Sequence, residues 1–189
     1  MDGCFCPMMT VGPPFIKALR TSLLKDAHLM IADPVEKVAD YVAAGADIIT
    51  FHPESTRHPH RVLQHLGSLT NANDPARGIV RGVALNPGTP LEVLEPLLEE
   101  LEVILLLAVN PGWGGQKFIP STFQRIEKTK QMIAAAGRGI VLAVDGGITR
   151  ANIVEVAKTG VDLIVTGSAV FDGRAAEENA RFMLQAVTL

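Results

Sequence analysis

The chain has 189 residues, of which 48% are hydrophobic and 20% charged, which is enough apolar surface for one core and excludes a disordered chain. Its net charge is -3, and its lysines and arginines are scattered, so it lacks the basic patch of a nucleic-acid-binding protein. This favours a small-molecule partner. Met1-Asp2-Gly3 does not open a leader peptide, and the longest aliphatic run, Val103 to Val109, is too short for a membrane span, so we expect a single cytoplasmic domain over residues 1–189 with no membrane partner.

The only cysteines, Cys4 and Cys6, are one residue apart, which is too close for an ordinary disulfide framework. A C-x-C pair is also a metal-binding pattern, but no second Cys/His pair at suitable spacing accompanies it. We expect two free thiols in a reducing compartment.

From Lys25 onward, short aliphatic or β-branched runs alternate with stretches of helical period, which is typical of βα units. The runs are nearly continuous in apolarity, as buried parallel strands are. Six strands are predicted, at Ala27–Ile31, Ile48–His52, Val80–Leu85, Val103–Asn110, Ile140–Asp145 and Leu163–Thr166.

Between these runs, apolar residues recur at the i, i+3, i+4 and i+7 spacing of a helix that covers a sheet. Helices are expected at Val35–Val42, after Pro120 with Phe123, Ile126 and Ile133 on one face, at Leu91–Leu101, at Ile153–Lys158 and at Ala175–Val187.

One internal similarity bears on the architecture. Ala44 to Ile49 resembles Thr159 to Ile164, and each segment ends a helix with Gly and starts a strand. The 115 residues from Gly45 to Gly160 correspond to about four βα units, half of an eight-strand barrel. Helix-Gly-x-Asp-strand is also a common turn, so alone it does not decide the fold.

The positions of the glycines favour a barrel over an open doubly wound sheet. The glycine fingerprint that follows the first strand of such a sheet is not present. Glycines instead follow the strands ending at Asn110, Asp145 and Thr166. In a (β/α)8 barrel, these strand ends form the active-site face and the usual phosphate site.

Three glycine-containing loops at this face suit a phosphate. They contribute Gly112, Trp113, Gly114 and Gly115, then Gly146 and Gly147, and finally Gly167 and Ser168. Without a Cβ, backbone N–H groups can approach an anion closely, and several neutral donors bind a dianion without Lys or Arg. Each loop alone could be only a tight turn.

Three polar residues end apolar strands. A carboxylate at the end of a buried strand is costly without a partner, so Asp145 indicates metal binding or proton transfer more than a loop-stabilising role. His28 also interrupts an apolar strand, where a hydrogen-bonded core histidine is the commoner outcome and a metal ligand the alternative. His52 ends the next strand and is expected to be at most a neighbour of the site.

These residues carry a family likeness. Met1 to Pro7 (M-D-G-C-F-C-P), Asp26 to Met30 (D-A-H-L-M) and Val109 to Phe118 (V-N-P-G-W-G-G-Q-K-F) resemble, in order, motifs of the ribulose-phosphate 3-epimerase family. Val144 to Ile148 and Gly167 to Phe171 complete the set. The chain is therefore similar to this family along most of its length.

The resemblance implies a metal-dependent (β/α)8 enzyme that interconverts D-ribulose 5-phosphate and D-xylulose 5-phosphate by moving a proton at C3 through an enediolate. It implies that Asp145 is one of two acid/base groups and that His28 and Asp145 bind one divalent metal ion, which could be Zn²⁺, Fe²⁺, Mn²⁺ or Co²⁺. The glycine loops would bind the phosphate, and Met1 and Met30 would border the enediolate.

Part of the family pattern has no counterpart in the chain. The family continues upstream of M-D-G with a strand reading H-x-D-x, which supplies another metal ligand and the second acid/base, and a still earlier strand with a substrate-contacting Ser. We therefore expect a barrel lacking its first one or two βα units, with two of four metal ligands. Leu107 stands where many relatives have Met, and Cys4 where they often have His.

Two alternatives stay open. One is a 3-epimerase for another ketose phosphate such as D-allulose 6-phosphate, because the motifs say little about sugar length. The other is an impaired form that only binds sugar phosphate or pairs with a full-length subunit. The sequence also leaves open whether the chain forms a homo-oligomer.

Overall fold

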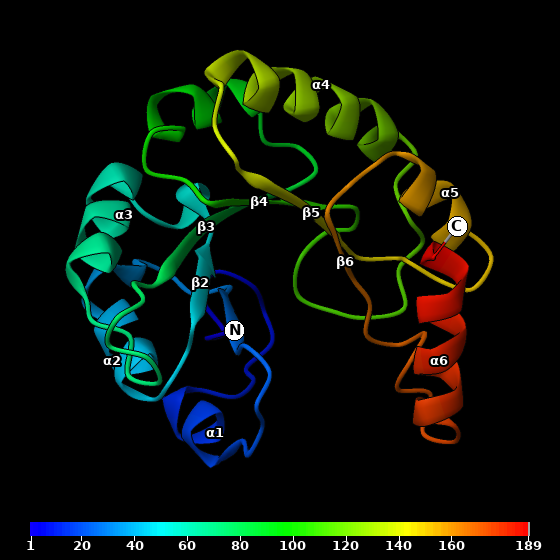
Figure 1. The fold of residues 1–189 in the computed structure, drawn as a ribbon, viewed down its shortest axis with the longest axis horizontal. Coiled ribbons are helices and arrows are strands. Elements are labelled where there is room, and N and C mark those ends of the chain that lie inside the picture. Colours follow the sequence, from blue (N-terminus) through cyan, green and yellow to red (C-terminus); the bar gives the residue numbers. More distant parts are fainter. Residues whose placement is uncertain (189) are drawn as a thin grey trace. The chain divides into compact units, whose positions relative to one another are not determined.

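The computed structural model describes residues 1–188, in which strands and helices alternate along the chain (Figure 1). None of the described helices is long and apolar enough to span a membrane. The chain divides into two compact units, Met1–Leu85 with Thr89–Ile104, and Asn86–Gly88 with Leu105–Leu189. The boundary falls inside one strand, β4 (Val103–Leu107), so both units contribute residues to it.

The first unit is built on parallel strands that neighbour one another in chain order. Ala27 pairs with Ile49, and Ile49 with Arg81. The strands are β1 (Asp26–Leu29), β2 (Ile48–Phe51) and β3 (Val80–Leu85), and the helices are α1 (Pro13–Ala18), η1 (Pro34–Glu36), α2 (Val38–Ala43), η2 (Pro53–Ser55), α3 (Pro59–Ser68) and η3 (Leu91–Leu97).

Helix α3 shows why a polar segment folds as a helix here. Pro59 occupies its first turn, where a missing N–H costs nothing. Val62, Leu63 and Leu66 recur at helical spacing and are fully buried, while Arg61 on the other face is exposed. Burial of one apolar stripe against the sheet therefore stabilises the helix. Figure 1 shows α2 and α3 on the same side of β2 and β3.

The second unit contains the end of β4 and the parallel pair β5 (Val141–Asp145) and β6 (Leu163–Val165). Its helices are α4 (Ser121–Ala136), α5 (Ile153–Lys158) and α6 (Ala176–Val187). Helices α5 and α6 pack side by side (Figure 1). Its core includes the fully buried Leu106, Ile126 and Leu142.

All six predicted strands are present, each within a few residues of its expected bounds. The predicted Leu91–Leu101 helix is instead the 3₁₀ helix η3, which contains Pro96 and ends at Leu97. The stripe from Val35 to Val42 is divided into η1, which starts at Pro34, and α2. Helices α1 and α3 were not predicted; α1 has no buried residue, and α3 lies in a polar stretch of the sequence.

The internal similarity corresponds to a repeated pair of hydrogen bonds between an aspartate and the backbone of the previous strand. The Asp47 N–H donates to the Lys25 carbonyl at 2.8 Å, and its Oδ2 accepts from the Lys25 N–H at 2.9 Å. Asp162 makes the same two hydrogen bonds to Leu142, at 2.9 and 2.8 Å. Each aspartate thus joins the strand it precedes, β2 or β6, to the start of the previous strand.

A third copy, at Glu102, lacks the Gly-x-Asp pattern. The Glu102 N–H donates to the Arg81 carbonyl at 2.9 Å, and its Oε2 accepts from the Arg81 N–H at 3.0 Å. This pair of hydrogen bonds is therefore made by the residue before β2, β4 and β6, once in every second βα unit.

Candidate active site

Two histidines from neighbouring strands meet in the first unit. His28 lies in β1, and His52 directly follows β2. Their Nε2 atoms are 2.9 Å apart and their rings stack at 5.0 Å between centroids. His52 is fully buried, with the ring of Phe5 at 4.6 Å from its own. Sequence reasoning placed His52 beside the site at most, whereas it contacts His28 directly.

Burial sets the charge state of His28. It is the main cause that lowers the pKa of His28 to about 3, and the electrostatic effects of the neighbouring His52 and of the N-terminus act in the same direction. His28 is therefore neutral near pH 7, and a neutral imidazole is the form that binds metal ions. One of the two facing Nε2 atoms must donate a proton and the other accept it.

The structure brings Met1, but not Met30, to a hollow that His28 lines. The hollow measures about 240 Å³, and Phe15 and Leu19 give it apolar walls. Met30 is partly buried just beyond β1, where its carbonyl lies 4.0 Å from the Cys6 thiol. Cys6 is buried and Cys4 exposed, and both are free thiols as predicted.

Asp2 fixes the segment that carries Met1, a role the sequence analysis did not assign. Its carboxylate accepts from the backbone N–H groups of Ala32 at 2.8 Å and of Cys4 and Phe5 at 3.0 Å each. Burial acts to raise the pKa of Asp2, but these hydrogen bonds outweigh it and lower the pKa to about 2. The only signal was its place in the M-D-G motif.

In the second unit, Asp145 ends β5 and is partly buried. Burial raises the pKa of Asp145 to about 6, although a hydrogen bond from the Gly146 N–H acts in the opposite direction. Its backbone carbonyl accepts from the Ala108 N–H at 2.7 Å, which ties the end of β5 to the residue after β4. A carboxyl group with a pKa near neutrality can both accept and donate a proton.

The loops after β4 and β5 pack tightly together. A Cβ on Gly147 would overlap the backbone of Phe118, and one on Gly146 would overlap the side chain of Val109. Both glycines have positive φ angles, +66° and +105°. Only glycine fits both the space and the backbone conformation at these positions.

The loop after β6 connects to the same region. Thr166 Oγ1 donates to the Ile148 carbonyl at 3.3 Å. Gly167 has open space where a Cβ would lie, and its carbonyl accepts from the N–H groups of Val170 and Phe171. The structure thus links all three predicted phosphate loops by packing or hydrogen bonding.

Several backbone donors in these loops are uncommitted. Within residues 1–188, the N–H groups of Gly114, Gly115, Gly147, Gly167 and Ser168 donate to no other residue. Gly114 and Gly115 have no atom near the position of a Cβ, whereas Gly112 is buried and Trp113 is 56% exposed. Such donors are suited to an anion with several oxygens.

Two amides shape these loops and were missed as site residues. Gln116 Nε2 donates to the carbonyls of Asn110 at 2.6 Å and Trp113 at 3.0 Å, so it closes the loop on itself. Asn152 Nδ2 donates to the Gly147 carbonyl at 3.0 Å. Gln116 lies inside a quoted motif, but nothing in its local pattern reveals its contacts.

The described residues fit a metal ion only in part. Among residues 1–188, no group of three or more His, Cys, Asp and Glu side chains gathers as a complete metal site. His28 has the neutral state a ligand needs, but its Nε2 faces His52. His28 and Asp145 belong to different units.

Comparison with known proteins decides the family. A sequence model described as "Ribulose-phosphate 3 epimerase family" matches residues 1–171. The chain belongs to the ribulose-phosphate 3-epimerase family. It is 44% identical over 176 residues to the ribulose-phosphate 3-epimerase of Escherichia coli K12, covering 91% of this chain and 74% of that protein.

A second epimerase relative, the chloroplastic ribulose-5-phosphate-3-epimerase of Arabidopsis thaliana, is 43% identical over 178 residues. The match covers 92% of this chain and 60% of the Arabidopsis protein, so the chain spans less than two thirds of that relative's length. The Bacillus subtilis ribulose-phosphate 3-epimerase is 40% identical over 174 residues, which are 90% of this chain and 76% of that protein.

Solved structures at lower identity confirm the fold class of this epimerase-family chain. KGPDC from Streptococcus mutans has a TM-score of 0.72 at 17% identity, over 94% of this chain and 79% of that chain. Orotidine 5'-phosphate decarboxylase from Pyrococcus horikoshii has a TM-score of 0.62 at 17% identity, over 88% and 75%. The fold is of the (β/α)8 barrel type, as predicted.

Proposed function

We propose that this chain belongs to an enzyme that interconverts D-ribulose 5-phosphate and D-xylulose 5-phosphate through proton transfer at C3. The observation that carries the proposal is the position of Asp145, whose pKa is raised to about 6, beside loops with uncommitted backbone N–H groups. Near neutral pH such a carboxylate removes the C3 proton and, once protonated, returns it. Membership of the epimerase family supports the same reaction.

In this proposal the phosphate of the substrate lies on the glycine loops of the second unit. Backbone N–H groups stabilise its negative charge by donating hydrogen bonds, and the close packing of Gly146 and Gly147 against the loop after β4 holds that part of the site in place before binding. His28, Met1 and Met30 contact the rest of the substrate. The loop residues assigned to substrate are Gly112, Trp113, Gly114, Gly115, Asp145, Gly146, Gly147, Gly167 and Ser168.

His28 and Asp145 are also the residues that would hold a divalent metal ion. Such an ion, when bound, stabilises negative charge on the enediolate oxygens. The neutral state of His28 supports ligation, whereas its contact with His52 would have to open first. The residues described here supply part of the ligand set.

Epimerisation also needs a group on the opposite face of C3. Asp145 serves one face, so it accounts for exchange of the C3 proton but not for inversion. The family resemblance implies a second carboxylate for that face. We propose that Asp145 by itself supports exchange of the C3 proton faster than inversion of the centre.

The test is deuterium incorporation at C3 of xylulose 5-phosphate in D2O, with Zn²⁺ or Mn²⁺ supplied, followed by NMR. We expect incorporation with the unaltered chain, loss of it in Asp145→Asn, and retention in Glu155→Gln, which removes an exposed charge from α5. Unchanged incorporation in Asp145→Asn would refute the role of Asp145. Inversion at C3 is measured in parallel with a version of the chain extended upstream, which tests the second acid/base. The same measurement with D-allulose 6-phosphate in place of xylulose 5-phosphate tests the substrate.

A further inference from the structure

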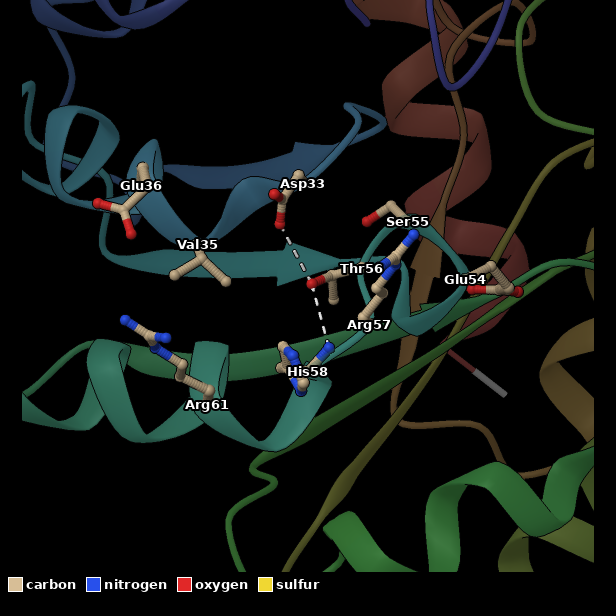
Figure 2. Close-up of a pocket in the computed structure, with 9 residues that line it drawn as sticks. All are labelled: Asp33, Val35, Glu36, Glu54, Ser55, Thr56, Arg57, His58 and Arg61. Carbon is tan, nitrogen blue, oxygen red and sulfur yellow. Dashed lines mark hydrogen bonds between the residues drawn. The ribbon is translucent and has the colours of Figure 1, made fainter.

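A polar hollow of about 430 Å³ lies in the first unit, between the segment after β1 and the start of α3 (Figure 2). Its ionisable lining residues are Asp33, Glu36, Glu54, Arg57, His58 and Arg61. None of the residues proposed to bind the epimerase substrate or a metal lines it.

The charges are divided between the two sides of the hollow. Figure 2 shows Asp33 and Glu36 on one side, with His58, which directly precedes α3, and Arg61 of α3 across from them. Within residues 1–188, the side chains of Arg57 and Arg61 have no ion-pair or hydrogen-bond partner, so no salt bridge closes the hollow. Unpaired guanidinium groups in a recess are available to an anion.

A chain of hydrogen bonds holds the polar lining in place. The Asp33 N–H donates to the Ser55 carbonyl at 2.8 Å, and Thr56 Oγ1 donates to Asp33 Oδ1 at 3.3 Å. Thr56 Oγ1 also accepts from the His58 N–H at 3.3 Å. Asp33 has a φ of +45°, the only positive φ of a non-glycine residue among residues 1–188. A strained backbone held by such contacts presents its side chain in one orientation.

The divided charge selects the chemistry of the ligand. Arginine binds phosphate through charge-assisted hydrogen bonds, and carboxylates accept hydrogen bonds from hydroxyl groups. A simple polyanion would face repulsion from Asp33 and Glu36, whereas a molecule with a phosphate at one end and hydroxyls at the other satisfies both sides. The volume is within the usual range for small-molecule sites, roughly 300–1,000 Å³. We propose that this hollow is a second binding site, for a sugar monophosphate.

The hollow is connected to the histidine pair. Glu54 Oε2 lies 3.6 Å from His52 Nδ1, and Ser55 Oγ donates to the His52 carbonyl at 2.6 Å. Glu54 also accepts a hydrogen bond from Thr89 Oγ1. A ligand that moves Glu54 therefore acts on a residue in contact with His28.

The test is a titration of the labelled chain with D-glucose 6-phosphate and, separately, with inorganic phosphate, observing the ring signals of His58 by NMR. We expect a saturable shift of His58, with glucose 6-phosphate binding more tightly than phosphate. Arg57→Gln and Arg61→Gln should each weaken binding about tenfold or more, the effect of losing one charge-assisted hydrogen bond. Glu36→Ala should remove the preference for the sugar.

The matched control is Arg138→Gln, which removes an exposed, unpaired arginine of the second unit and should leave the titration unchanged. The His58 response should also persist in Asp145→Asn, which separates it from the proposed epimerase reaction. Absence of a saturable shift, unchanged affinity in both arginine variants, or equal affinity for phosphate and glucose 6-phosphate would each overturn the proposal.

Discussion

At the scale of single residues, Asp145 combines a proposed functional role with a cost in stability. Burial raises the pKa of Asp145 from 3.8 to about 6, so its ionised form is disfavoured in the folded state. A raised carboxyl pKa favours folding below the unfolded value, and this advantage is lost as the pH rises from about 4 to about 6. At pH 7 the folded chain therefore carries the cost of an ionised, partly buried group.

Asp145→Asn should accordingly stabilise the fold at pH 7 while it removes proton exchange at C3. We expect a gain of about 1–2 kcal/mol in the free energy of unfolding, less than the full pKa shift implies because the group is partly exposed. Urea denaturation between pH 3.5 and 7.5 measures it, and the gain should vanish near the acidic end. A gain independent of pH would contradict the assignment.

Gly147 is the residue at which packing and backbone conformation both exclude a side chain. Gly147→Ala would place a methyl group against the Phe118 backbone at a φ of +66°, and we expect a loss of about 2–4 kcal/mol. Gly114→Ala is the control, because open space surrounds that position and its effect should stay within about 0.5 kcal/mol. Equal losses in urea denaturation would show that the two loops are not packed as described.

At the scale of elements, the acidic residues before β2 and β6 make the same backbone hydrogen bonds in different surroundings. Asp47 is 3% exposed, and its Oδ1 also accepts from Asn73 at 3.0 Å and Arg77 at 2.6 Å. Burial acts to raise the pKa of Asp47, but the hydrogen bonds and the charge of Arg77 keep it below its ordinary value. Asp162 is exposed, and its carboxylate accepts a hydrogen bond from the Leu142 N–H.

The two aspartates should therefore differ as sites of substitution. We expect Asp47→Ala to cost about 2–4 kcal/mol, because it removes the buried carboxylate that accepts hydrogen bonds from Asn71, Asn73 and the partly exposed Arg77. We expect Asp162→Ala to cost about 1–2 kcal/mol. Since the pKa of Asp47 is lowered, its contribution is present above the ordinary carboxyl pKa and is lost as the pH falls through the lowered value. Urea denaturation at pH 7 and pH 3 should show the Asp47→Ala deficit shrinking in acid.

At the scale of the whole molecule, the open question is whether the two units unfold together. Strand β4 contributes Val103 and Ile104 to one unit and Leu105 to Leu107 to the other, so neither unit can unfold without breaking this strand. We predict one cooperative transition, with a calorimetric enthalpy equal to the van't Hoff enthalpy.

Asp47→Ala and Asp162→Ala, one in each unit, provide the matched pair for this test. Both should lower the midpoint of the same calorimetric transition. Two separate transitions, each shifted by only one of the variants, would show two domains instead of one. Sedimentation velocity on the same samples measures the oligomeric state, which the sequence leaves open.

Local sequence patterns were sufficient to predict most of the fold, and they also picked out the glycine loops of the candidate site. The strands were found because burial on both faces makes their apolar runs nearly continuous, and the glycine loops because they follow strands such as that ending at Asp145. Helix α1 was missed because it buries no residue and so has no apolar stripe to recognise. Pro96 made η3 a 3₁₀ helix where spacing alone suggested an ordinary one.

The sequence by itself determined the order of the strands, the family and the loops that suit a phosphate, because these depend on residues close together in the chain. Only the tertiary structure decided that His52 contacts His28, that Gly147 packs on Phe118, and that the pKa of Asp145 is raised. It also revealed the hollow between Asp33 and Arg61. Each of these depends on parallel strands and their following loops packing together, which brings side chains into contact across 24 or more residues of chain and removes them from water.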